Sequence, residues 1–284
     1  MCLKSLSPLR YPGGKAKLYD YICNVFEANN LKNVTYVELF AGGAGLAISL
    51  LLNKKVKRII INDIDYCIFC FWKCVVNRSD EFCQRIGTCN ITIDEHEKQK
   101  TIYKDPYNYS EMDVAFATLF LNRTHRSGIL NGGIIGGKSQ EGKYKINCRF
   151  NKENIIERIK NIARYKDYIT VTNLDAIDFI SNQKEILRKK CFFYIDPPYV
   201  VKGGDLYKNA FSIADHKKLA SAIYKILKNR KWIITYDNHN LIEQLYSKNT
   251  IKHFEIQYTA QNKKRGEEIM IFSNRVKIPG CKIL

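Results

Sequence analysis

The chain has 284 residues, enough for one large domain or for a core domain with an insertion. Its 46 Lys and Arg outnumber its 28 Asp and Glu and give a formal net charge of +18. This excess favours a nucleic acid as partner, although some of the lysines will only solvate helix faces. The first ten residues lack the apolar core of a signal peptide, and no segment approaches the roughly 18 apolar residues of a membrane span. We therefore expect a cytoplasmic protein without a membrane partner.

The N-terminal part predicts a strand, a glycine loop, a helix and a second strand. Residues 34–39 (VTYVEL) indicate a strand, FAGGAG and LAISLLLN a loop and a helix, and RIII at 58–61 the next strand. Glycines where a strand becomes a helix let a backbone approach a ligand, although a tight turn explains them equally well. Asp63 follows Gly42 by about 20 residues, the spacing of the ribose-binding acid in Rossmann-like folds. Further upstream, RYPGGKAKL taken alone indicates a surface turn with a solvated Lys15.

The next helix, YCIFCFWKC, carries Cys67, Cys70 and Cys74 at the spacing of one buried face. A zinc site that also uses Cys83 or Cys89 is the alternative, but no second close Cys or His pair completes it. Since a cytosolic chain keeps its cysteines reduced, we predict neither disulfides nor a metal site.

From about residue 77 to 167 the sequence is polar, tyrosine-rich and interrupted. It contains two helix-like segments, DVAFATLFLNR and NKENIIERIKNIARY, on either side of a glycine-rich stretch that suggests extended segments and turns. The strand and helix pattern then returns in YITVTNLDAIDFI, CFFYIDPPY, IADHKKLASAIYKILKN and KWIITYDN, with closing strands near HFEIQYT and EEIMIFSN. This order predicts an α/β fold with one doubly wound sheet and a module inserted between its second and third strands.

The apolar strand CFFYI ends at Asp196, because Pro197 and Pro198 have no N–H to donate to a ladder. Asp-Pro-Pro-Tyr is then a stiff loop at the carboxyl end of a strand, where open α/β sheets hold their ligands. An ordinary turn with a capping acid is the less favoured alternative.

Taken in order, RYPGGK, FAGGAG, an acidic strand end, LFLNRT and DPPY resemble the Dam-type (alpha-group, DPPY-motif) N6-adenine-specific DNA methyltransferases. The resemblance covers nearly the whole chain and continues through YKNAFSIADHKKLA, WIITYDN and EEIMIFSN. It implies a Rossmann-like S-adenosylmethionine-dependent methyltransferase sheet formed by residues 1–75 and 168–284, with a target-recognition module at 76–167. Duplex DNA is then the substrate, and a restriction endonuclease is a candidate partner.

The resemblance also implies where the cofactor binds. Tyr11 and Lys15 would border the methionine moiety, with Lys15 facing its carboxylate. Asp63 would hold the ribose hydroxyls, and Asp175 would lie near the adenine, with Asp178 as a competitor. The implied cofactor-binding residues are Tyr11, Lys15, Phe40, Gly42, Gly43, Asp63, Asp175 and Asp196.

The same resemblance implies that Asp196, Pro197, Pro198 and Tyr199 receive the target base. An exocyclic amino group is a poor nucleophile, because its lone pair is delocalised into the ring. The Asp196 carboxylate and the Pro197 carbonyl provide acceptors for its two hydrogens, and they stabilise the positive charge that builds on the nitrogen. Tyr199 offers an aromatic face to a base flipped out of the duplex. Neither a separate base nor a metal is assigned.

The inserted module supplies basic residues suited to phosphates and base edges. After LFLNRT it reads HRSGILNGG and YKINCRF, which departs from the pattern of GATC-reading members and weighs against a GATC target. The expected DNA-binding residues are Arg123, Arg126, Lys138, Lys143, Lys145 and Arg149.

Three alternatives to adenine methylation remain: a cytosine-N4 methyltransferase, an RNA methyltransferase and a catalytically inactive DNA-binding relative. Lys15 and Asp63, together with DPPY, are present and argue against the inactive relative. For His125 and His239 we expect surface or capping roles, because methyl transfer to an amino group needs no histidine.

Overall fold

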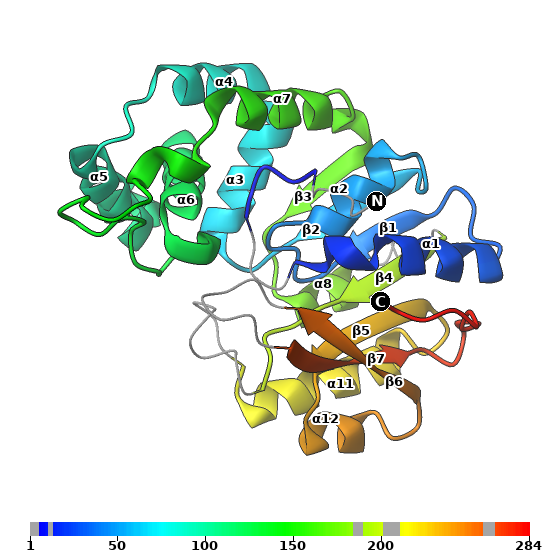
Figure 1. Ribbon diagram of the computed structural model, residues 1–284. Helices are drawn as coiled ribbons and strands as arrows, with labels where there is room; N and C mark the ends of the chain where they lie inside the picture. Colours follow the sequence, from blue (N-terminus) through cyan, green and yellow to red (C-terminus); the bar gives the residue numbers. More distant parts are fainter. Residues whose placement is uncertain (1–5, 11–13, 184–189, 201–210, 258–264) are drawn as a thin grey trace.

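The computed structural model describes residues 6–10, 14–183, 190–200, 211–257 and 265–284 (Figure 1). Its centre is a seven-stranded sheet with the order β3-β2-β1-β4-β5-β7-β6. The five strands from β3 to β5 run parallel and follow the Rossmann order 3-2-1-4-5, while β7 pairs antiparallel with β5 and β6. The Rossmann-like α/β fold predicted from the sequence is therefore confirmed. The strands are β1 (Thr35–Glu38), β2 (Arg58–Asn62), β3 (Ile169–Thr172), β4 (Cys191–Ile195), β5 (Lys231–Asp237), β6 (Thr250–Gln257) and β7 (Arg265–Phe272).

Helices cover both faces of the sheet. One face packs on α1 (Tyr19–Ala28), α2 (Gly45–Leu52) and α3 (Tyr66–Asn77), and the other packs on α8 (Ala176–Asn182), α11 (Ile213–Ile226) and α12 (Asn240–Leu245). Because successive side chains of a strand point to opposite faces, each central strand supplies both cores. Tyr36 lies in the first cluster, for example, whereas Val37 lies in the second.

The chain between β2 and β3 leaves the sheet and forms a helical unit (Figure 1). After α3 it contains α4 (Ser79–Thr88), α5 (Ile93–Lys104), α6 (Glu111–Thr124) and α7 (Lys152–Ala163). The two helices expected from the sequence correspond to α6 and α7, whereas α4 and α5 were not predicted. The glycine-rich stretch has turns, the short 3-10 helices Arg126–Gly128 and Ile146–Arg149, and one isolated bridge between His125 and Ile134. Other 3-10 turns are Lys15–Leu18, Pro106–Asn108 and Lys166–Tyr168.

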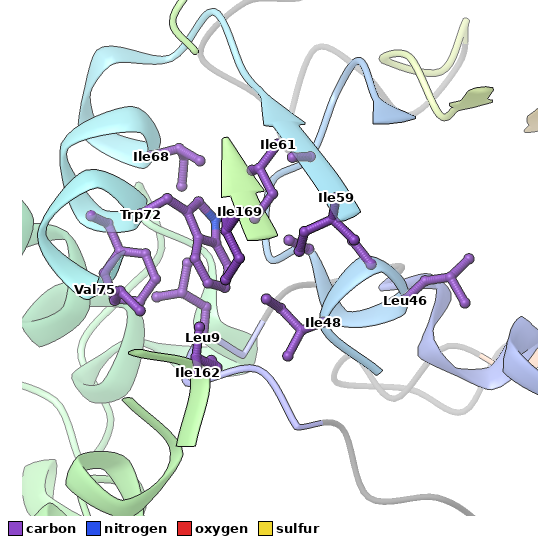
Figure 2. Close-up of a cluster of buried hydrophobic side chains, with 14 of the residues drawn as sticks. Leu9, Leu46, Ile48, Ile59, Ile61, Ile68, Trp72, Val75, Ile162 and Ile169 are labelled. Carbon is purple, nitrogen blue, oxygen red and sulfur yellow. The ribbon is translucent and has the colours of Figure 1, made fainter. Parts of the chain in front are cut away.

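The helical unit is anchored to the sheet by a shared apolar core. Figure 2 shows the Trp72 side chain of α3 lying among Ile61, Ile169, Leu9 and Ile162, which come from two strands, the N-terminal segment and α7. The Trp72 indole also donates a hydrogen bond to the Gly42 carbonyl at 2.8 Å. One large side chain thus connects the core of the inserted helices with the glycine loop.

Cys67, Cys70 and Cys74 are fully buried on α3, which confirms that they form a packed helix face. The nine cysteines within the described ranges are free. In the same part of the chain, no cluster of three or more His, Cys, Asp or Glu side chains is arranged to hold a metal ion. None of the helices described is both long enough and apolar enough to cross a membrane.

Candidate active site

Polar side chains from four neighbouring strands share one edge and one face of the sheet. Glu38 ends β1, Asp196 follows β4, Thr235 lies in β5, and Glu268 lies in β7. All four alternate with residues of the opposite core, so they lie on the face that α1 covers. β7 reaches the carboxyl edge with its first residues because it runs antiparallel, and Glu268 pairs with Asp237. Three acidic side chains therefore lie close together at the carboxyl edge of the parallel strands.

Both carboxylate oxygens of Asp196 are engaged by side chains far away in sequence. Lys15 Nζ lies 3.0 Å from Oδ2. The Thr235 hydroxyl donates to Oδ1 at 2.6 Å, and Thr235 is in turn 3.1 Å from the hydroxyl of Tyr194. These contacts fix the orientation of the carboxylate where strand β4 ends. Charge-assisted bonds of this kind are stronger than neutral ones.

Tyr199 closes the same network. Its hydroxyl accepts a hydrogen bond from Lys15 Nζ at 2.8 Å and lies 3.4 Å from Asp196 Oδ1. The ring is buried, its centroid is 6.4 Å from that of Tyr236, and the Lys15 ammonium is 5.2 Å from the ring centroid. The loop continues into Val200, whose N–H donates to Asp237 Oδ1 at 3.1 Å. Lys15, Asp196 and Tyr199 are thus brought together.

The resemblance predicted that Lys15 faces the carboxylate of the cofactor. In this structure its ammonium forms an ion pair with the Asp196 carboxylate. Tyr11 falls outside the described residues. Phe40 is half-buried, with its ring edge-to-face against Phe211 at 5.7 Å. Pro197 and Pro198 are buried after the strand.

The glycine loop after β1 is tied to the acid after β2. Gly42 has a φ of +46°, which favours glycine, and its N–H donates to Asp63 Oδ2 at 2.7 Å. Asp63 Oδ1 accepts the N–H of Asp65 at 3.0 Å. Burial and the nearby Asp65 raise the pKa of Asp63 to about 7, and these two N–H donors lower it in part. Each oxygen retains a further lone pair, so the carboxylate can still accept hydroxyl groups.

Glu38 anchors the helix that follows the glycine loop. Its Oε1 accepts the hydroxyl of Tyr36 at 3.1 Å and the N–H of Ala47, in α2, at 3.0 Å. Burial, with a smaller contribution from the charge of Asp196, raises the pKa of Glu38 to about 8, while the hydrogen bonds from Tyr36 and Ala47 lower it in part. At neutral pH Glu38 is therefore mostly a neutral acid beside the charged pair of Lys15 and Asp196.

Amide side chains join the ends of β2 and β3. Asn62 donates to the carbonyls of Leu39 and Leu174, and Asn173 donates to the carbonyl of Asp63 at 2.8 Å. Asp175 is the N-cap of α8 and accepts the N–H groups of Ile177 and Asp178 through Oδ1. Asp175 is thus a helix cap in this structure, and its expected place near the cofactor adenine stays a prediction.

The motif LFLNRT holds the N-terminal segment. Asn122 accepts the N–H of Arg10 at 2.8 Å and donates to the Arg10 carbonyl at 2.8 Å and to the Gly128 carbonyl at 2.9 Å. Arg123 donates to the Pro8 carbonyl, and Arg158 donates to the Ser7 carbonyl at 2.8 Å. The helical unit therefore binds the segment that precedes Lys15 through hydrogen bonds to its backbone.

Arg123 does not lie on the surface. Its side chain is 9% exposed and donates a hydrogen bond to the Pro8 carbonyl. We therefore do not propose Arg123 as a DNA contact. The remaining residues of the expected set are exposed around the glycine-rich stretch; they are Arg126, Lys138, Lys143, Lys145 and Arg149.

The two histidines differ. His239 is the N-cap of α12 and accepts the Leu241 N–H at 3.1 Å, which confirms a capping role. A surface role for His125 is wrong: it occupies the cap position between α6 and the 3-10 helix Arg126–Gly128, but its side chain is buried, with Nε2 2.8 Å from Nε2 of His96. Burial, and then the neighbouring His96, lowers the pKa of His125 to about 4.

Sequence reasoning missed Glu38, Thr235 and Glu268 as members of the site. The two glutamates carried a signal, since each is an acid placed where an apolar strand should be buried, in TYVEL and in EEIMIF. Thr235 carried none, because threonine is common in strands.

Comparisons with known proteins show the family to which the chain belongs. The chain is 24% identical over 208 residues to the type II methyltransferase M.MjaIII of Methanocaldococcus jannaschii, covering 67% of this chain and 68% of that protein. It is 26% identical over 214 residues to the modification methylase StsI of Streptococcus sanguinis, covering 70% of this chain but only 29% of that longer protein. Among solved structures, a putative RNA methyltransferase from Pyrococcus horikoshii aligns with 93% of this chain and 85% of its own at 13% identity and a TM-score of 0.44. A family model matches residues 11–260, and the chain belongs to the D12 class N6 adenine-specific DNA methyltransferase family.

Proposed function

We propose that this protein transfers the methyl group of S-adenosylmethionine to the N6 amino group of an adenine flipped out of duplex DNA at a specific site. The observation that carries the proposal is the Asp196 carboxylate, held on both oxygens at the rigid end of β4 beside the glycine loop and Asp63. Family membership supports a DNA methyltransferase. A DNA substrate accords with the cytoplasmic location predicted from the sequence, which remains a prediction.

The residues present fit the cofactor. Asp63 is fixed by two backbone N–H groups and still has lone pairs for two ribose hydroxyls. Gly42 and Gly43 are buried and have no side chains, so the cofactor can approach the backbone of this loop closely. When bound, S-adenosylmethionine supplies an electrophilic methyl group on a sulfonium.

The chain's own part in the reaction is to hold the amino group. Asp196 and the Pro197 carbonyl accept its two hydrogens, which orients the nitrogen lone pair towards the methyl group. The carboxylate also stabilises the positive charge that develops on the nitrogen in a site shielded from water. Thr235 keeps Asp196 Oδ1 in place during this step, since its hydroxyl has a single strong acceptor at 2.6 Å. The Tyr199 ring is the surface against which the base would stack.

We further propose that residues 76–167 read the DNA target. The exposed residues Arg126, Lys143 and Arg149 gather around the glycine-rich stretch of the helical unit. They suit phosphate contacts, and an arginine there could read a guanine edge. A partner restriction endonuclease is suggested by the names of the two relatives, a type II methyltransferase and a modification methylase.

The test is methyl transfer from labelled S-adenosylmethionine to a library of duplexes, followed by digestion and mass spectrometry of the methylated base. We expect N6-methyladenine at one sequence motif, abolished in Asp196→Asn and unchanged in Glu27→Gln, a control at an exposed acid of α1. N4-methylcytosine, or methylation of RNA alone, would instead assign the alternative functions. Turnover of Asp196→Asn at the wild-type rate would refute the assigned role of Asp196.

A further inference from the structure

Glu268 is an acid in a place where acids are rare. It lies on β7, its side chain is 0% exposed, and its neighbours along the strand on the same face are apolar. The preceding residue, Glu267, points to the other side, is exposed, and contacts Asn238 and His253. A fully buried carboxylate requires a compensating charge or hydrogen bonds.

Lys15 provides that charge. Its Nζ lies 3.8 Å from Glu268 Oε2 and 3.0 Å from Asp196 Oδ2, and its side chain is 6% exposed. A single buried ammonium therefore lies between two carboxylates. Within the described residues it contacts Asp196 and Tyr199 at hydrogen-bond distance, while Glu268 stays about 1 Å beyond the 2.7–2.9 Å of a charged hydrogen bond.

The proposed reaction makes this arrangement change. The amino group of the target base needs a carboxylate oxygen of Asp196 as acceptor, and Oδ1 already faces the hydroxyls of Thr235 and Tyr199. The base is therefore accepted at Oδ2, where it competes with the Lys15 ammonium. The Lys15 ammonium is 3.0 Å from Oδ2, slightly beyond the 2.7–2.9 Å usual for a hydrogen bond between charged groups, whereas the Thr235 bond at 2.6 Å has its usual length. An ammonium that gives up Asp196 inside a buried site needs another anion at once.

We propose that Glu268 is a positioning residue that takes over the Lys15 ammonium when the target base engages Asp196. A movement of Lys15 Nζ by about 1 Å brings Glu268 to hydrogen-bond distance, within the flexibility of a lysine side chain. Glu268 thereby keeps the Lys15 ammonium paired with a carboxylate while Oδ2 of Asp196 becomes available to the amino group of the base. This inference rests on the proposed function, because it assumes a base that competes for Asp196.

The first test compares Glu268→Gln, Glu268→Asp and the matched control Glu267→Gln in single-turnover methyl transfer. For Glu268→Gln we expect the methyl-transfer rate at saturation to fall about tenfold to a hundredfold, the equivalent of one hydrogen bond between charged groups. The dissociation constant for S-adenosylmethionine, measured by calorimetry, should change by less than about threefold. Glu268→Asp, which keeps the charge, should recover part of the rate, and Glu267→Gln should behave as wild type. A wild-type rate in Glu268→Gln would overturn the proposal.

A second test needs no turnover and so separates this proposal from the proposed function. Lys15→Met leaves Asp196 and Glu268 without their shared cation and should lower the melting temperature. Adding Glu268→Gln to it should restore part of that loss, whereas adding Glu267→Gln should restore none. If the effects of Lys15→Met and Glu268→Gln on melting temperature simply add, the two side chains are not coupled and the proposal fails, whatever the enzyme methylates. Should Lys15→Met not fold, the kinetic series on Glu268 decides alone.

Discussion

The raised pKa of Glu38 makes a pH-dependent contribution to stability that Glu38→Gln should remove. In the folded protein burial raises the pKa of Glu38 to about 8, from an ordinary value of 4.5. The unfolded chain ionises this group near its ordinary pKa. The folded state therefore holds a proton that the unfolded state has lost, and stability falls as the pH rises towards 8. Glutamine keeps an acceptor for Tyr36 and Ala47 but cannot ionise.

The magnitude follows from linkage. Between pH 7 and pH 9 a group with a folded pKa of about 8 releases its proton, and the free energy of unfolding should fall by about 1.4 kcal/mol. Most of that fall occurs below pH 8, and above pH 9 the contribution levels off. Glu38→Gln should lack this component, so the difference in stability between wild type and variant should shift by about 1.4 kcal/mol in favour of the variant.

The assay is urea unfolding of both proteins at pH 7 and pH 9, with Glu27→Gln, in the exposed part of α1, as control. Taking the difference between variants cancels the titration of every other group. Equal pH dependence of wild type and Glu38→Gln would refute the argument that Glu38 is protonated in the folded protein. The same shift in Glu27→Gln would show that the effect is not specific to the buried site.

Four further outcomes are expected. Asp63→Asn should weaken S-adenosylmethionine binding in calorimetry by about 1.5–3 kcal/mol. Wild-type affinity should rise as the pH passes about 7, where Asp63 ionises, and a rise retained in the variant would contradict this. Tyr199→Ala should impair methyl transfer by roughly 1–3 kcal/mol more than Tyr199→Phe, and identical rates would exclude a stacking role. Asn122→Ala should lower the free energy of unfolding by about 1–3 kcal/mol in urea, because the backbone groups of Arg10 lose their partner. Lys143→Gln should weaken binding to every duplex alike and make the slope of log affinity against log salt shallower by about 0.9 if Lys143 contacts a phosphate, and an unchanged slope would place the contact elsewhere.

Local patterns in the sequence were sufficient for the central sheet. Residues 34–39 and 191–195 are apolar runs that indicate strands, and Pro197 and Pro198 must end the second run. Parallel strands end at the same edge of a sheet, which accords with the single site to which the family resemblance assigned the glycine loop, Asp63 and Asp196.

Local patterns failed in the inserted unit. Helices α4 and α5 were missed because their sequences are strongly polar, and their few buried side chains, such as Phe82 and Ile102, pack only against other helices. Arg123 was predicted to bind DNA because charge alone places arginine on a surface. Its position on the inner side of α6 next to the Pro8 carbonyl depends on where the N-terminal segment runs.

The sequence by itself determined the individual strands of the central sheet, the glycine loop and the rigid Asp-Pro-Pro-Tyr loop. Each of these depends on residues that are neighbours in the chain. Only the tertiary structure decided which groups surround Asp196. Lys15 and Tyr199 are 184 residues apart, and Thr235 and Glu268 reach the site through strand pairing, one of them on a strand that runs the opposite way. Such pairings depend on the register and direction of non-local strands, which no local pattern encodes.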